Sequence, residues 1–201
     1  MRLESKWALV AAVALTLGTL GAEPYARLLT PYYVAVSQLM ARGHPWTIVG
    51  IDIGPSTQSP GKALRLTGFF YDRAGDSQPA GQIDAELQVA AVAESPLVFW
   101  TVLALWPVGS LRGRFVVLLF GVPIFLGLEA STTVFQLLSP LAYGSAVAAG
   151  DPQPSTGWDG WSRFIENGGR IALALTGAML TVAAAQWTRK GAASGSPMKI
   201  P

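Results

Sequence analysis

The sequence predicts an α+β membrane protein, in which four transmembrane helices carry a small extracytoplasmic antiparallel β-sheet module between the first and the second helix. Three observations predict this fold class. Hydrophobic residues make up 51% of the 201 residues. Charged residues make up only 13%, against roughly 25% in soluble domains. Finally, the apolar residues gather in four blocks, with three strand-like stretches between the first two blocks.

The four apolar blocks have the composition of membrane-spanning helices, which need about 20 residues to cross the hydrocarbon core. We expect one span in residues 1–22, a helical hairpin of two spans in residues 95–138, and a last span in residues 170–188. The first block also resembles a signal peptide, because a basic start is followed by an apolar stretch and then by small residues. However, Leu20 occupies a position where cleavage requires a small residue. An uncleaved helix is the preferred interpretation, and a cleaved signal peptide is the alternative.

Positive charges near the ends of the blocks predict the orientation of the chain. They gather on one side of the expected membrane, where Lys and Arg mark the cytoplasmic face, and comprise Arg2, Lys6, Arg112, Arg114, Arg189 and Lys190. The pattern predicts a multi-pass protein with both termini in the cytoplasm and a disordered cytoplasmic tail at residues 189–201. Residues 23–94 and 139–169 then lie outside, and the lipid bilayer is an expected partner.

The first outside segment, residues 23–94, begins with apolar residues at helical spacing in "PYARLLTPYYVAVSQLMARG". Three strand-like stretches follow, separated by turn sequences: "WTIVGIDIG", "ALRLTGFFY" and "GQIDAELQVAAV". In the first of them Val49, Ile51 and Ile53 alternate with polar or small residues, which predicts that these three share the apolar face. A sheet of this size is marginal alone, so we expect it to lean on the helix, the bilayer or a partner.

The second outside segment, residues 139–169, contains "STGWDGWSRFIENGGR". Trp158 and Trp161 stand at helical spacing, which predicts a short amphipathic helix with both rings as interfacial anchors. The alternative is an aromatic platform for a ligand.

Several classes of site are excluded or weakened by composition. The chain has no cysteine, which excludes disulfides, thiolate metal sites and a cysteine nucleophile. A histidine-rich metal site or a Ser–His–Asp triad would rest on the single histidine, His44. Glycine-rich phosphate loops, metal-ligand spacings and a basic–aromatic face are absent from the sequence. We therefore expect a non-enzymatic protein with no catalytic residues, metal, cofactor or nucleic-acid partner.

One carboxylate, Glu129, lies inside the longest apolar block, in "VPIFLGLEASTTVFQLL". A charge at membrane depth costs about 2.5–3.5 kcal/mol or more. Such a residue therefore needs an ionic or hydrogen-bonding partner, or it has a functional role. Thr132, Thr133 and Gln136 follow at helical spacing and form one polar face with it. Arg170, at the outer end of the last block, is a possible ionic partner. These residues are the candidates for interaction with a partner or an ion.

Three roles for Glu129 remain open from the sequence. The side chain could hold the helices or a partner protein together, line a cavity for a proton, ion or small ligand, or act as an acid or base in an intramembrane enzyme. A residue at the margin of the lipid is a further alternative. Most acid–base chemistry needs a second group, and no motif surrounds the acidic residues of the outside segments.

The order of the parts resembles the exosortase H-associated membrane proteins. The last expected strand runs directly into the hairpin, in "AELQVAAVAESPLVFWTVLALWPVGSLRGRFVVLLFGVPIFLGLEASTTVFQLL", and a last span and a basic end follow. Pro96 and Leu97 match the Asn-Pro-Leu-type junction of the family, whereas Ser95 differs from it. The resemblance covers most of the chain as a pattern. It implies a bacterial inner-membrane protein associated with a transmembrane enzyme that processes the C-terminal anchor signals of exported proteins, and it transfers no catalytic residues.

These observations lead to one functional hypothesis and two alternatives. The leading hypothesis is an accessory subunit that docks an integral membrane partner, of the protein-sorting (exosortase-type) or envelope-assembly class, through the outside sheet and the polar face of Glu129. The first alternative is a small transporter or a proton- or ion-coupled channel component that uses Glu129. The second is an extracytoplasmic sensor whose sheet binds a ligand.

Overall fold

The computed structural model describes residues 3–71, 77–106, 111–151 and 157–194, and side chains within residues 21–71, 77–106, 113–151 and 157–187. Its elements, in chain order, are α1 (Leu3–Ala41), β1 (Trp46–Pro55), β2 (Lys62–Phe70), β3 (Gly81–Gln88), α2 (Val89–Leu105), α3 (Leu111–Glu129), the π-helical turn η1 (Ala130–Val134), α4 (Phe135–Ala148), α5 (Gly157–Phe164), the kink η2 (Ile165–Gly169) and α6 (Arg170–Ser194).

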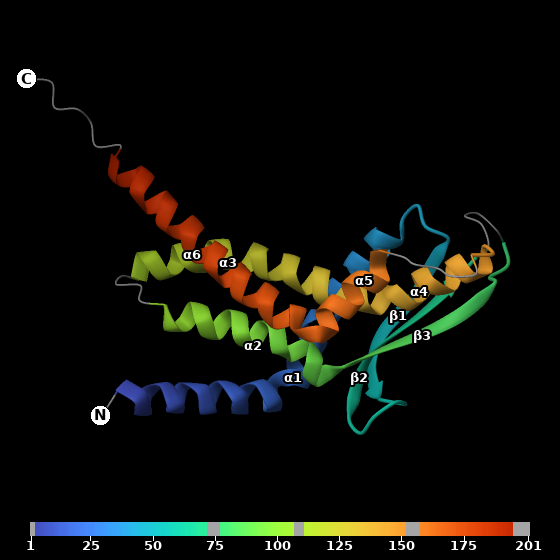
Figure 1. Cartoon of the computed structure of the whole chain (residues 1–201), viewed down its shortest axis with the longest axis horizontal. Helices are drawn as coiled ribbons and strands as arrows, with labels where there is room; N and C mark the ends of the chain where they lie inside the picture. The colour runs from blue at the N-terminus through green and yellow to red at the C-terminus, as the bar shows by residue number, and fades with distance from the viewer. Residues whose placement is uncertain (1–2, 72–76, 107–110, 152–156, 195–201) are drawn as a thin grey trace, which may run out of the picture.

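The molecule is elongated and has two different halves (Figure 1). The bundle half contains α2, α3, α6 and the N-terminal part of α1, which run side by side. The sheet half contains the three strands, the C-terminal part of α1, α4 and α5. The beginnings of α1 and α3 and the ends of α2 and α6 all point to the same end of the molecule (Figure 1).

The three strands form an antiparallel sheet in the order β1-β2-β3, which confirms the small antiparallel sheet predicted from the sequence. One face is apolar and buried, and the other carries a row of charges in which Asp52 pairs in register with Arg65 and Arg65 with Glu86. Arg65 forms an ion pair with Glu86 at 3.0 Å. The backbone N–H of Thr57, 2.9 Å from the Glu86 carboxylate, lowers the pKa of that group.

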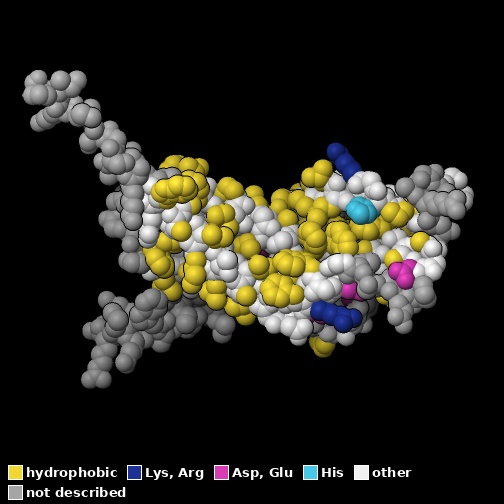
Figure 2. Space-filling view, turned by 45° about the horizontal axis from the view of Figure 1, so that its top comes forward, with side chains coloured by type: hydrophobic (Ala, Val, Ile, Leu, Met, Phe, Trp, Pro, Cys, Tyr) yellow, Lys and Arg dark blue, Asp and Glu magenta, His cyan; other side chains and the backbone are white. Residues whose placement is uncertain are grey.

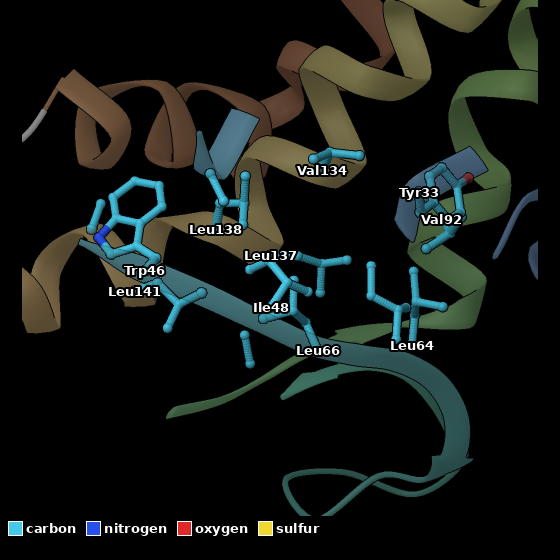
Figure 3. Close-up of a cluster of buried hydrophobic side chains, with 14 residues drawn as sticks. Tyr33, Trp46, Ile48, Leu64, Leu66, Val92, Val134, Leu137, Leu138 and Leu141 are labelled. Carbon is cyan, nitrogen blue, oxygen red and sulfur yellow. The ribbon is translucent and has the colours of Figure 1, made fainter. Parts of the chain in front are cut away.

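The apolar face of the sheet is covered by α1 and α4, so the sheet leans on two helices of its own chain. Figure 3 shows this core, whose fully buried side chains come from α1, β2, α2, η1 and α4: Tyr33, Leu64, Leu66, Val92, Val134, Leu137, Leu138 and Leu141. Helix α4 reaches Ala148, ten residues beyond the predicted end of the hairpin at residue 138. The helix continues because Leu137, Leu138 and Leu141 recur at helical spacing and face the sheet.

A second core lies in the bundle half and joins α2, α3 and α6. Helix α6 contributes small side chains to it, namely Ala174, Ala178 and Ala185, all buried. A Cβ atom at Gly177 would lie only 2.6 Å from Cδ1 of Leu128 on α3. Small residues at such positions allow two helix backbones to approach closely, as membrane-embedded helices often do.

The prediction of four transmembrane helices is wrong. Within the described residues, two helices are long and apolar enough to cross a membrane: Gly113–Ala148, with a mean hydropathy of 2.0, and Gly157–Trp187, with a mean hydropathy of 1.4. Helix α2 is apolar but has only 17 residues, because it begins directly at the end of β3. The expected first span falls in α1, a single helix of 39 residues, and the side chains of residues 1–20 lie outside the described set.

The two long helices expose a broad apolar surface on the bundle half. Figure 2 shows hydrophobic side chains spread over this half, whereas the charged side chains visible in that view lie on the sheet half. The exposed residues, which we call the apolar belt, are Phe115, Leu118, Leu119 and Val122 of α3 and Ile171, Leu175, Met179, Leu180 and Trp187 of α6. An exposed apolar surface of this kind is typical of contact with a membrane or another protein.

Candidate functional site

Glu129 is fully buried at the end of α3, where the bundle half meets the sheet half. The hydroxyl of Tyr33, on α1, donates a hydrogen bond to Oε2 of Glu129 at 2.6 Å, and Thr133 donates a longer one to the same oxygen at 3.4 Å. Tyr33 and Thr133 are fully buried as well. The carboxylate therefore ties α1 to the helix that runs from α3 into α4.

The π-helical turn η1 begins directly after Glu129. Such turns insert one extra residue into a helix, disturb its regular hydrogen bonding and occur frequently at functional sites. The hydroxyls of Ser131 and Thr132 both bond back to the carbonyl of Leu128, at 2.9 and 2.8 Å. Thr132 is fully buried. The hydroxyl of Thr132, a predicted candidate for partner contact, is thus engaged by its own helix.

Two aromatic side chains from other elements bond to carbonyls near this turn. The indole N–H of Trp161, on α5, donates to the carbonyl of Ser131 at 2.6 Å. The hydroxyl of Tyr32, on α1, donates to the carbonyl of Leu126 at 2.6 Å. Buried carbonyls need such partners, so α1 and α5 both contribute to the stability of the junction.

Arg170 is the second buried charge, at the start of α6 and directly after the kink η2, where Asn167 and Gly168 leave the helical conformation. It donates a hydrogen bond from Nη2 to Oε1 of Gln136 on α4. It lies within electrostatic range of Glu129 and Glu94, although no carboxylate oxygen of the described residues lies within 4.0 Å of it. The structure thus places the predicted ionic partner near Glu129, but without a direct ion pair.

The turn before Arg170 depends on two glycines. Gly168 has a φ of +95°, which side chains other than glycine rarely adopt. A Cβ atom at Gly169 would lie 2.5 Å from the backbone oxygen of Phe164. Both positions exclude larger residues, and the turn they form fixes where α6 begins and therefore where Arg170 lies.

Three polar atoms at this junction are buried without a hydrogen-bond partner among the described residues: Oε1 of Glu129, Nη1 of Arg170 and the hydroxyl of Tyr25. Tyr25 lies close enough to interact electrostatically with Glu129. We call the residues Tyr25, Tyr33, Glu129, Thr133, Gln136 and Arg170 the Glu129 cluster. It can hold a proton and form further hydrogen bonds, because it combines one carboxylate, one guanidinium and unused hydrogen-bonding atoms.

The two predicted interfacial anchors pack within the protein. Trp158 stacks on Phe135 of α4, with ring centroids 4.5 Å apart, and meets Trp46 of β1 edge-on at 5.7 Å. Trp161 lies 5.3 Å from Phe164, which is exposed at the end of α5. Both tryptophans are partly buried and join α5 to α4. Their role at a membrane interface stays a prediction.

Sequence reasoning missed the tyrosines of α1 as partners of Glu129. Their positions were interpreted as apolar positions of an amphipathic helix, although a buried tyrosine hydroxyl needs a hydrogen-bond acceptor. A buried carboxylate needs hydrogen-bond donors in the same way. A tyrosine-rich helix and a carboxylate in an apolar block are therefore the sequence signal that could have predicted this contact. Comparison of the chain with protein-family models, with curated proteins and with solved structures found no match.

Proposed function

We propose that the protein is a non-enzymatic accessory subunit of the bacterial inner membrane that docks a membrane-embedded partner of the protein-sorting (exosortase-type) or envelope-assembly class. The observation that carries the proposal is an exposed apolar stripe on the sheet-half part of α1, which we call the outer stripe. It consists of Pro24, Leu28, Pro31, Ala35 and Leu39.

The outer stripe has the features of a docking surface. Its residues recur at helical spacing, a pattern that normally marks the buried face of a helix. Helix α1 already buries its opposite face, through Ala26 and Tyr33, while Leu28 and Leu39 remain 77% and 59% exposed. Arg27 and Arg42 flank the stripe and are exposed. An apolar centre with a polar rim is the usual anatomy of a protein interface, and an apolar helix face suits a groove on a partner.

The apolar belt supports the proposed placement in a membrane. Helix α3 has 19 residues, or about 28 Å at 1.5 Å per residue, and the segment from Arg170 to Trp187 has nearly the same length. Both values are close to the hydrocarbon thickness of about 30 Å. With α3 and α6 in the bilayer, Glu129 and Arg170 lie at its boundary, the sheet half lies outside, and the beginning of α3 and the end of α6 lie on the cytoplasmic side.

The Glu129 cluster supports docking indirectly in this proposal. Glu129 itself is fully buried, so a partner contacts the outer stripe rather than the carboxylate. The hydrogen bond from Tyr33 to Glu129 fixes one face of α1 against the junction, and the opposite face then points outward. A substitution of Glu129 affects docking by changing the position of α1.

The test is a detergent co-purification of the tagged full-length chain, read by mass spectrometry. We expect a stoichiometric integral membrane partner with the wild type, and a loss of roughly tenfold or more with the double variant Leu28→Glu/Leu39→Glu, because charges placed in the centre of an interface remove its main anchors. The control is Val49→Glu, at a 58% exposed position of β1 outside the stripe. Equal recovery with the double variant and the wild type would show that the stripe is not the docking surface.

A second candidate function is a small transporter or a proton- or ion-coupled component. The unpartnered buried atoms of Glu129 and Arg170 favour it, since buried ionisable residues of membrane-spanning helices often mark proton or ion pathways. It predicts a pH-dependent flux in liposomes that contain the purified chain, lost in Glu129→Gln, which keeps the size of the side chain but cannot ionise. A flux that is the same in the variant, or no flux above empty liposomes, would eliminate this candidate.

A further inference from the structure

An apolar pocket of about 330 Å³ lies between the end of α2 and the beginning of α3. These helix ends are at the end of the molecule away from the sheet (Figure 1), whereas Glu129 stands at the opposite end of α3. The pocket is lined by Trp100, Leu103, Ala104, Trp106, Arg114, Val117 and Leu118. Leu103 and Val117 are buried and form its floor, whereas Trp106 and Leu118 are 39% and 51% exposed at its rim.

Arg114 is the charged residue of this lining. It is exposed and forms no ion pair with a carboxylate of the described residues. Residues 95–128 contain no Asp or Glu at all. Arg114 also stands in the first turn of α3, where the helix dipole is positive. This end of the pocket therefore attracts an anion, and guanidinium groups bind phosphate through paired hydrogen bonds.

The remaining lining suits a hydrocarbon chain. Leu118 belongs both to the pocket and to the apolar belt, so a chain can pass from the bilayer into the pocket without crossing water. Two tryptophans, Trp100 and Trp106, line it, and tryptophan gathers at the level of lipid headgroups. The volume is at the lower end of the range of ligand pockets, about 300–1,000 Å³, which fits part of one acyl chain.

We propose that this pocket binds an anionic phospholipid, with the phosphate on Arg114 and one acyl chain against Trp100, Val117 and Leu118. A phospholipid carries an anion and a hydrocarbon chain on one molecule, as the pocket requires, whereas free phosphate would use Arg114 alone. The inference rests on the proposed placement of α3 in a bilayer. It does not depend on a docking partner.

The test is native mass spectrometry of the full-length chain in detergent with added phosphatidylglycerol or phosphatidylcholine. We expect one phosphatidylglycerol per chain, retained in preference to phosphatidylcholine. Arg114→Gln lowers its retention by about tenfold, the loss expected for a charge-assisted contact. Ala104→Phe, which fills the pocket and keeps the charge, lowers the retention of both lipids. The control Arg163→Gln, at an exposed arginine of α5, leaves retention unchanged.

A second measurement uses only the wild type, so that it does not depend on the folding of a variant. Phosphatidylglycerol with a photoactivatable acyl chain is expected to label residues between Trp100 and Leu118. Labelling spread evenly over the apolar belt, Met179 included, would overturn the proposal, as would equal retention by Arg114→Gln and the wild type. Displacement by millimolar inorganic phosphate would also overturn it, because it would identify a soluble-anion site. Co-purification of a partner is independent of all these outcomes.

Discussion

Replacing Glu129 with leucine is expected to destabilise the protein by about 3 kcal/mol, the upper end of the range for leaving a buried hydrogen-bonding group without its partner. The leucine has no acceptor for the hydroxyl of Tyr33, which is fully buried. The substitution also removes the carboxylate that has the largest favourable electrostatic interaction with the buried guanidinium of Arg170. The variant leaves one buried donor without an acceptor and one buried positive charge with less compensation.

Two milder variants separate these contributions. Glu129→Gln retains an oxygen that can accept the Tyr33 hydrogen bond, and Tyr33→Phe retains the charge and removes only the hydroxyl. Each is expected to cost about 1–2 kcal/mol. Thermal unfolding of the full-length chain in detergent, followed by circular dichroism, ranks the three variants by stability, and we expect Glu129→Leu to be the least stable. If Glu129→Leu unfolded at the wild-type temperature, the carboxylate would contribute nothing to stability and the structural role of the cluster would be refuted.

Leu66→Ala is expected to have an effect of similar or larger size, about 2–5 kcal/mol. Leu66 lies in the middle of β2, is fully buried, and belongs to the core between the sheet, α1 and α4 shown in Figure 3. The substitution removes apolar contacts and leaves a cavity that neighbours on three elements line. The three-stranded sheet has no second core of its own to compensate, because its other face is polar.

The same unfolding experiment measures this prediction. For a chain of this length, 1 kcal/mol corresponds to roughly 2–4 °C, so a midpoint lower by roughly 4–20 °C is expected. The matched control is Val49→Ala, on an exposed side chain of the same sheet, with an expected change within about 0.5 kcal/mol. A similar midpoint for both variants would show that the sheet is held by something other than this core.

The sheet shows where sequence patterns succeed and where they fail. Alternation placed Leu64 and Leu66 on the buried face, and both are fully buried. It placed Val49 there as well, but Val49 is exposed, because the register of β1 and β2 shifts between Ile48 and Gly50. This β-bulge adds one residue to the strand and brings Ile48 to the core face instead of Val49. Nothing in the alternation itself marks such an insertion.

The candidate site was predictable in its residues but not in its geometry. A charge in an apolar block must be partnered, which identified Glu129, and the spacing of its neighbours identified Thr133. The contact with Tyr33 depends on the path of α1, 96 residues earlier in the chain, so it follows from tertiary packing. The π-helical turn after Glu129 also has no local sequence signature, whereas the turn before Arg170 contains two adjacent glycines, Gly168 and Gly169, which are a usual signal for the end of a helix.

The direct junction of β3 and α2, between Gln88 and Val89, has a geometric consequence. Successive side chains differ by 180° in a strand but by about 100° in a helix. One residue inserted at the junction would rotate the buried side chains of α2 by about 100° about the helix axis, away from their neighbours on α1 and α6, or would turn the apolar side chains of β3 to the polar face. We therefore expect a change in chain length at this junction to disrupt the packing of both halves. Because no residue separates β3 from α2, the position of the helical bundle fixes the position of the sheet.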